Sequence, residues 1–216
     1  MKAKFVYEAI GDVLKGKSKE EIISSLENTD LDFNNLLFKS AKAGFLPGVK
    51  KALEMGANVH TLNDNPLQWA SHKGHYDIVE LLLKNDADVH ALDDFALRWA
   101  SKNGHLDVVE LLLKNGADVH AKNDYALRWA SLNGHYNVVE LLLKNGADVH
   151  NHNDYALRHA SRYGRLDVVE LLLKNGADIH ANNDEVLQLA SQNGHKDIVE
   201  LLLKNGANAQ MLLPIR

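Results

Sequence analysis

A phrase of 30 residues returns along most of this chain, and it limits what the chain can fold into. The segments that align without a gap are 61–90, 91–120, 121–150, 151–180 and 181–210. Residues 31–60 fit the same register more loosely, as a divergent repeat. Because a fixed period of roughly 20 to 50 residues is typical of repeat architectures, we expect six repeats in a single continuous domain. We expect an N-terminal helical cap at 1–30 and an apolar tail at 211–216 to flank them.

The first half of each repeat has the pattern of a short helix. In the segment 121–150, Leu127, Ala130 and Ser131 share one face, at spacings of three and four residues. Asp124 is placed to cap the start of this helix, and Gly134 is placed to end it.

The second half of each repeat predicts a second helix. Here Val138, Leu141 and Leu142 are expected to point inward, with Val139 flanking them, until Gly146 ends the helix. One such hairpin has too much apolar surface to be stable alone, so each repeat must stack on the next. The predicted fold class is therefore an all-α solenoid of stacked helix-turn-helix repeats.

Composition excludes several classes of protein. The chain has no cysteine, which rules out a disulfide framework, a thiolate zinc site and a cysteine nucleophile, and favours a reducing, cytoplasmic location. No segment has the apolar run of a signal peptide or of a membrane span, so we expect no membrane partner. The formal net charge of -5 lacks the basic excess that is typical of nucleic-acid binding.

Two stretches carry a family resemblance. The phrases NGHLDVVELLLKNGADVHA at 103–121 and NGHYNVVELLLKNGADVH at 133–150 closely resemble the ankyrin repeat, and the resemblance covers residues 31–210. The family's usual period is about 33 residues, and its first helix opens with Thr-Pro-Leu-His, where residues 125–128 here read YALR. The missing residues fall between Val149 and Asp154, where the family builds a projecting hairpin finger. We expect shortened fingers, and partner contacts on the inner helices instead.

The resemblance also implies a function. Ankyrin arrays are typically non-enzymatic scaffolds for protein–protein interaction that need no cofactor. Shortened repeats of this kind are similar to those of large DNA viruses and some bacteria. That similarity suggests an intracellular protein, in the setting of an infected host cell, that recruits or inhibits a host protein.

The second helix is nearly constant from repeat to repeat. Each copy places a glutamate four residues before a lysine, as Glu140 and Lys144 are placed. Such pairs favour the helix by roughly 0.2 to 0.5 kcal/mol each. We expect them on a solvated outer face.

The first helix varies and carries aromatic and basic residues away from its core face. Trp, Tyr and Arg dominate the hot spots of protein interfaces, and the family resemblance places this helix on the concave inner surface. Packing stays open as an alternative for the tryptophans, because the family often has a semi-buried leucine there and arginines can stack on such rings. The candidate partner-binding residues are Trp69, Lys73, Phe95, Arg98, Trp99, Lys102, Tyr125, Arg128, Trp129, Tyr155, Arg158, His159, Arg162, Tyr163 and Arg165.

Histidine and serine also recur once per repeat. Stacked helices lie about 8 to 10 Å apart, whereas zinc needs ligands at about 2.0 to 2.1 Å. We therefore expect no metal site, and a hydrogen-bonding role in the loop for His120 and its equivalents. His135 and its equivalents are placed to start the second helix. Ser131 and its equivalents face the core, where the hydroxyl can bond a preceding carbonyl.

No catalytic constellation stands out in the sequence. We find no phosphate-binding, zinc-protease or nucleophile-elbow motif, and evenly repeated polar residues are what stacking produces. The prediction is a monomeric, non-enzymatic protein that binds an acidic or amphipathic protein surface along its first helices. Two alternatives stay open. One is nucleic-acid binding through the arginine and aromatic columns, and the other is self-assembly through the apolar C-terminal end.

Overall fold

The computed structural model describes residues 32–212, and these residues form helices, with no strand among them. The predicted N-terminal cap at 1–30 and the last residues of the tail lie outside the described residues. The α-helices are α3 (Phe33–Ala43), α4 (Leu46–Glu54), α5 (Thr61–Lys73), α6 (Tyr76–Lys84), α7 (Ala91–Asn103), α8 (Leu106–Lys114), α9 (Ala121–Asn133), α10 (Tyr136–Lys144), α11 (Asn151–Arg162), α12 (Leu166–Lys174), α13 (Ala181–Gln192) and α14 (Lys196–Lys204). A short 3₁₀ helix, η1 (Ala209–Leu212), follows them.

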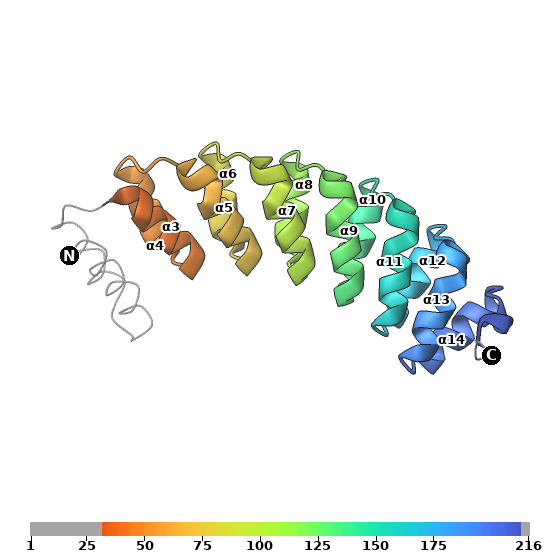
Figure 1. Cartoon of the computed structure of the whole chain (residues 1–216). Helices are drawn as coiled ribbons and strands as arrows, with labels where there is room; N and C mark the ends of the chain where they lie inside the picture. The colour runs from red at the N-terminus through yellow and green to blue at the C-terminus, as the bar shows by residue number, and fades with distance from the viewer. Residues whose placement is uncertain (1–31, 213–216) are drawn as a thin grey trace. The chain divides into compact units, whose positions relative to one another are not determined.

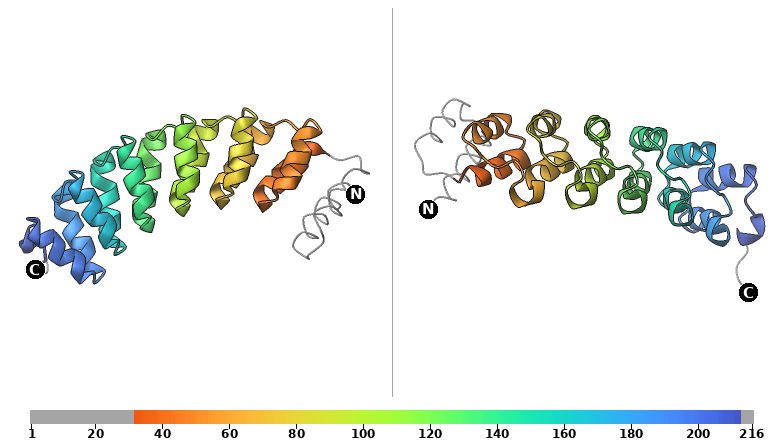
Figure 2. Two further views of the ribbon diagram at one scale, coloured as in Figure 1. Left: turned by 180° about the vertical axis from the view of Figure 1, so that it is seen from behind. Right: turned by 90° about the horizontal axis from the view of Figure 1, so that it is seen from above.

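The helices form two compact units. One comprises the described residues up to Ala96 together with Lys114–Ala117, and the other comprises Leu97–Leu113 together with the described residues from Asp118 onward. In the first unit α3 packs on α5 and α4 packs on α6. In the second unit α9, α11 and α13 form one layer while α10, α12 and α14 form the other (Figures 1 and 2). The predicted all-α solenoid of stacked helix pairs is confirmed.

The core lies between the two layers. Leu127, Ala130 and Ser131 of α9 are fully buried, as their spacing predicts. Full burial of a leucine side chain contributes about 1.5 to 3 kcal/mol. In α10 one prediction is wrong, because the buried side chains are those of Val138, Val139 and Leu142, while Leu141 is half-buried. Since α10 packs on both α9 and α12, its buried face is turned toward Val139.

Glycines end the helices as expected. Gly134 has φ 81°, a left-handed conformation that a residue with a side chain rarely adopts. Its N–H donates to the carbonyl of Ser131 at 3.1 Å, and the next N–H, of His135, donates to Ala130 at 3.0 Å. Gly146 ends the other helix of the repeat in the same conformation, with φ 93°.

A left-handed turn precedes most of the first helices, and the sequence did not predict it. In α9, Lys122, Asn123 and Asp124 have φ of 53°, 56° and 50°, so the right-handed helix begins only at Tyr125. Each such residue costs roughly 1 to 2 kcal/mol, and Asn and Asp tolerate the conformation best. The turn replaces the projecting finger, and the predicted shortening of the fingers is confirmed by the lack of strands in residues 32–212.

Asp124 therefore does not cap the helix in the predicted way. Its carboxylate instead accepts hydrogen bonds from the N–H of Asp148 at 2.9 Å and from the side chain of Asn151 at 3.0 Å. These partners lie in the loop after α10 and at the start of α11. Asp124 thus joins one repeat to the next.

The second helices present their charges on the surface. Lys144 lies 2.9 Å from Glu140, and Lys84 lies 2.9 Å from Glu80, which confirms these two predicted pairs.

At the C-terminal end η1 packs against α13, and its residues Met211 and Leu212 are half-buried. Among residues 32–212, no helix combines the length and hydropathy needed to cross a membrane.

Candidate binding face on the first helices

The structure brings most of the candidate residues together on the first helices of the second unit. Those on α7, α9 and α11, or directly after α11, are Arg98, Trp99, Lys102, Tyr125, Arg128, Trp129, Tyr155, Arg158, His159, Arg162 and Tyr163. Trp69, Lys73 and Phe95 belong to the first unit, where Lys73 is exposed and the other two are half-buried. Arg165 lies apart from both groups, as described below.

Arginines and tyrosines alternate across these helices. The guanidinium carbon of Arg98 lies 5.2 Å from the centre of the Tyr125 ring. Arg128 lies 5.7 Å from Tyr125 and 5.3 Å from Tyr155, and Arg158 lies 5.9 Å from Tyr155. Each distance falls within the range of a cation–π interaction, about 6 Å. We call these five residues the arginine–tyrosine ladder.

Two arginines of the ladder, Arg128 and Arg158, also hold the left-handed turns. Arg128 donates from Nε to the carbonyl of Asn123 and from Nη2 to that of Lys122, both at 2.9 Å. Arg158 makes the same two bonds in its own repeat, at 2.9 and 3.1 Å. In the first unit Gln68 takes this place and donates to the carbonyl of Asn63 at 2.6 Å. Part of each guanidinium is therefore committed to the fold.

The tryptophans are half-buried, and lysines of the chain cover them. The ammonium of Lys102 lies 4.2 Å from the Trp99 ring and 4.4 Å from the Trp129 ring, so it bridges α7 and α9. In the first unit Lys42 lies 3.9 Å over Trp69. These contacts support a packing role for the tryptophans beside any binding role. Lys42 was not among the predicted residues, although it occupies the same repeat position as Lys102.

The irregular repeat at 151–180 continues the aromatic surface. His159 stacks on Tyr155 with ring centres 3.8 Å apart, and it lies 6.3 Å from Tyr163, which is 45% exposed. Arg162 lies 5.7 Å from the Tyr163 ring. Burial first, and then the nearby arginines, lower the pKa of His159, so this ring is neutral at neutral pH. Burial raises the pKa of Tyr125, which outweighs the two neighbouring arginines and keeps its hydroxyl protonated.

An acidic residue ends the ladder. Nη1 of Arg158 lies 2.5 Å from Oε2 of Glu185, and the amide of Asn182 donates to the same oxygen at 2.6 Å. Burial acts to raise the pKa of Glu185, but the hydrogen bonds from Asn182 and Arg158 outweigh it and hold that pKa below its ordinary value. Glu185 was not among the predicted residues, although it stands in the repeat position of Tyr125 and Tyr155.

Arg165 contacts the preceding repeat. Its Nε donates to the carbonyl of Leu132 at 3.2 Å. His135 reaches back in the same way to the carbonyl of Lys102 at 3.0 Å, and His195 reaches that of Arg162 at 2.9 Å. His135 and His195 also precede α10 and α14, so their predicted position at the start of the second helix is confirmed.

The other column of histidines hydrogen-bonds the aspartates that recur from repeat to repeat. His120 Nδ1 lies 3.1 Å from Asp124 Oδ1, and His150 lies 3.2 Å from Asp154, which confirms a hydrogen-bonding role in the loop. Within residues 32–212, no group of three potential ligands is placed to hold a metal ion.

The recurring serines differ in part from the prediction. The serines of the inner repeats are fully buried, as Ser131 is, whereas Ser191 in the last repeat is exposed. Among the described residues nothing hydrogen-bonds the hydroxyl oxygen of Ser131, so the predicted bond to a preceding carbonyl is wrong. The side chain is small enough for close packing, and its hydroxyl is not placed to act as a nucleophile.

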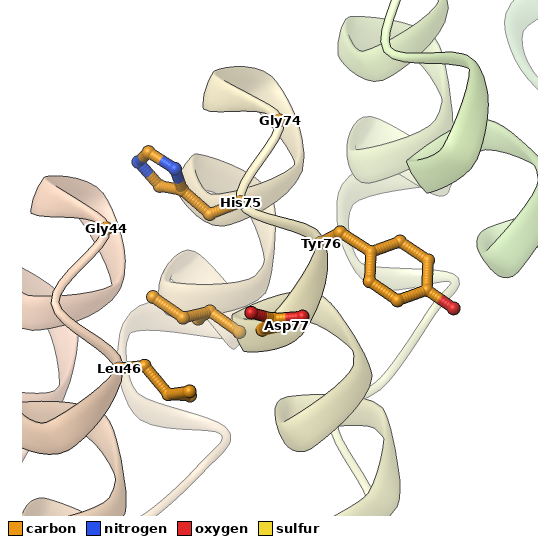
Figure 3. A pocket seen from close by; sticks show the side chains of 7 residues that line it. Gly44, Leu46, Gly74, His75, Tyr76 and Asp77 are labelled. Carbon is orange, nitrogen blue, oxygen red and sulfur yellow. The ribbon is translucent and has the colours of Figure 1, made fainter.

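A hollow of about 320 Å³ opens in the first unit, between the ends of neighbouring helix pairs. Figure 3 shows it beside Gly44 and Leu46 on one side and His75, Tyr76 and Asp77 on the other. A side chain at Gly44 would meet the His75 ring at 2.7 Å, and one at Gly104 would meet His135 in the same way. Since the arrangement recurs with the repeat, we attribute the hollow to stacking.

Stacked helix pairs with a varied first helix and a constant second helix define a helical-repeat solenoid. The family model for ankyrin repeats matches the chain at residues 13–93, 37–123, 90–153 and 127–211. The chain therefore belongs to the ankyrin-repeat family. Members of this family are in general protein–protein interaction modules without enzymatic activity. A search of curated proteins found no match to the chain.

Proposed function

We propose that the protein is a non-enzymatic interaction module that binds a partner protein along the first helices of its second unit. The observation that carries this proposal is the ladder of Arg98, Tyr125, Arg128, Tyr155 and Arg158, which runs across three neighbouring helices. Arginine and tyrosine contribute most when they are partly desolvated and already ordered, because little side-chain entropy is then lost on binding. The contacts within the ladder supply that order.

The charges favour an acidic or amphipathic partner surface. The face carries Arg98, Lys102, Arg128, Arg158 and Arg162, although the chain as a whole has a formal charge of -5. A basic strip on an acidic protein steers an acidic partner toward one face and repels it from the others. We propose recruitment or inhibition of that partner as the outcome, in a reducing, intracellular compartment and, for a viral or bacterial source, in a host cell.

We further propose that the protein acts as a monomer. An apolar C-terminal end could pair with a second copy of the chain, but Met211 and Leu212 already lie in η1, which packs against α13. This intramolecular contact reduces the apolar area left for a second copy.

A pair of exposed tyrosines allows a direct test of the binding face. Tyr163 follows the first helix α11 and is 45% exposed, and Tyr136 begins the second helix α10 and is 37% exposed. A photo-cross-linking amino acid placed at either position in the full chain should leave the fold intact. We expect a partner from an extract of the native source to be captured from position 163 and not from position 136.

Arg128→Gln supplies the second arm of this test. A glutamine can still hold the left-handed turn, as Gln68 does in its repeat, but it removes the charge from the ladder. We expect this variant to lose the cross-link from position 163 while its thermal unfolding stays close to that of the wild type. Equal capture from positions 136 and 163, or capture that is indifferent to Arg128→Gln, would exclude the proposed face.

A further inference from the structure

The hydrogen bonds of Arg128 and Arg158 differ at one nitrogen only. Arg128 and Arg158 both use Nε and Nη2 to hold the turn of their own repeat. The remaining nitrogen, Nη1, bonds the carboxylate of Glu185 in the case of Arg158. Among the described residues, nothing hydrogen-bonds Nη1 of Arg128. The guanidinium carbon of Arg128 lies 5.3 Å from the centre of the Tyr155 ring. The repeat position that holds an acid beside Arg158 therefore holds a tyrosine beside Arg128.

We infer that Glu185 plays, inside the chain, the role that a carboxylate of the partner plays at Nη1 of Arg128. This inference rests on the proposed function and names the chemistry of the partner: an extended, acidic peptide segment. Both repeats share the turn, the arginine and its two carbonyl bonds, so Arg128 keeps Nη1 for a ligand carboxylate as Arg158 keeps it for Glu185. A guanidinium favours a carboxylate because it presents several N–H groups in one plane.

The surroundings of Arg128 strengthen the choice of an anion. The side chain of Arg158 is only 14% exposed when it bonds Glu185, so an arginine at this position is largely shielded from water once a carboxylate covers it. Arg128 occupies the same position in its repeat and is also half-buried, but Tyr155 brings it a ring without a formal charge. Beside Tyr155, a carboxylate would neutralise a partly desolvated cation, and electrostatic attraction is stronger there than in bulk water.

The repeat spacing sets the spacing of the acids. The ladder supplies one arginine per repeat, and neighbouring packed helices lie about 8 to 10 Å apart. A polyproline II segment has 3 residues per turn and rises about 3.1 Å per residue, so every third side chain points the same way at intervals of about 9 Å. An extended segment with an acid at every third residue therefore matches the spacing of the ladder, with one of its acids beside Arg128. The step at Arg158 is already filled by Glu185.

Two peptides of equal composition test the spacing. The probe is a fluorescein-labelled peptide with four copies of Glu-Pro-Pro, and its control carries the same four glutamates in one block. Fluorescence polarisation with the full chain at low salt should show the spaced peptide binding about threefold to tenfold more tightly, since one well-placed charge-assisted hydrogen bond is worth roughly that factor. Equal binding of the two peptides would contradict the repeat-matched geometry.

Glu185→Gln and Glu140→Gln form a matched pair of variants. Each removes one negative charge, but Glu185 lies on the ladder while Glu140 pairs with Lys144 on the second helix. If Glu185 imitates the partner, Glu185→Gln makes Nη1 of Arg158 available to the peptide. The affinity for the spaced peptide should then rise by about threefold to tenfold. Glu140→Gln should leave the affinity unchanged. An equal gain from both variants would reduce the effect to overall charge and overturn the inference.

Tyr155→Glu makes the opposite change. It places an internal acid beside Arg128, as Glu185 lies beside Arg158, and should abolish binding of the spaced peptide. Circular dichroism and a thermal melt check that the variant folds. Arg128→Gln should likewise lower the affinity for the spaced peptide, and it leaves Tyr155 unchanged. If Arg128→Gln leaves the peptide affinity unchanged, Arg128 does not hold the carboxylate and the inference fails.

Two further outcomes separate this inference from the proposed function. If neither peptide binds but position 163 still captures a partner, the binding face stands and the acidic segment is wrong. The control probe is an oligo-dT of twelve nucleotides. If it binds more tightly than the spaced peptide, and more tightly still to the Glu185→Gln variant, the ladder binds nucleic acid instead. Stacking of bases on tyrosine and strong salt dependence would accompany that outcome.

Discussion

The carboxylate of Asp124 accepts a hydrogen bond from the backbone N–H of Asp148, 24 residues further along the chain. The same bond joins Asp64 to Asp88 at 2.8 Å and Asp154 to Asp178 at 2.8 Å. Each aspartate is buried, and a histidine from the preceding loop also contacts it, as His120 contacts Asp124. In each of these repeats, one buried carboxylate thus holds the loop that stands where the ankyrin family has its projecting finger.

Replacing Asp124 with alanine should be among the most destabilising single changes in the loops. It removes an acceptor of several hydrogen bonds and leaves the N–H of Asp148 without its partner, so we expect a loss of about 2 to 4 kcal/mol in the free energy of unfolding. Urea denaturation followed by circular dichroism measures this loss. Asp184→Ala is the control, because the side chain of Asp184 is 19% exposed, against 3% for Asp124. Equal losses at the two sites would contradict the role given to the buried carboxylate.

Ser131→Ala should stabilise the protein. The Ser131 hydroxyl is fully buried and its oxygen has no hydrogen-bond partner among the described residues. Burial of an unpaired hydroxyl costs free energy, so its removal should raise the free energy of unfolding by about 1 kcal/mol. Ser191→Ala is the matched control, since this serine is exposed in the equivalent position and shares the same change in helix propensity. A gain at position 191 as large as that at 131 would assign the effect to propensity alone.

The sequence predicts the helices and their stacking better than it predicts the candidate site. Helix pairs follow from the periodic leucines and from glycines such as Gly134, because these signals are local to one repeat. The ladder is a contact between residues such as Arg128 and Tyr155, 27 positions apart, and no local pattern specifies it. The left-handed turns were also missed, although the Asn123-Asp124 pair that tolerates them recurs in most repeats. Their arginine partners could be assigned only once the turn was seen.

The ion pair of Arg158 and Glu185 should give the stability a defined pH dependence. The pKa of Glu185 lies below its ordinary value of 4.5 in the folded protein. Folding therefore stabilises the charged carboxylate, so this contribution is present above pH 4.5 and is lost as the pH falls through the lowered pKa. Glu185→Gln should flatten that part of the curve of unfolding free energy against pH. An unchanged pH profile for Glu185→Gln would show that the pair contributes nothing to stability.

Arg165→His should leave both fold and binding intact. Arg165 was a candidate contact residue in the sequence, but its guanidinium reaches back to the carbonyl of Leu132, as His135 and His195 reach back to the preceding repeats. A histidine can make that bond, so we expect the thermal midpoint and the affinity for the spaced acidic peptide to match those of the wild type. Arg165→Ala removes the bond and should lower the free energy of unfolding by about 1 kcal/mol, again without loss of affinity. If Arg165→His folds normally but loses the peptide, Arg165 belongs to the binding face and its purely structural assignment is wrong.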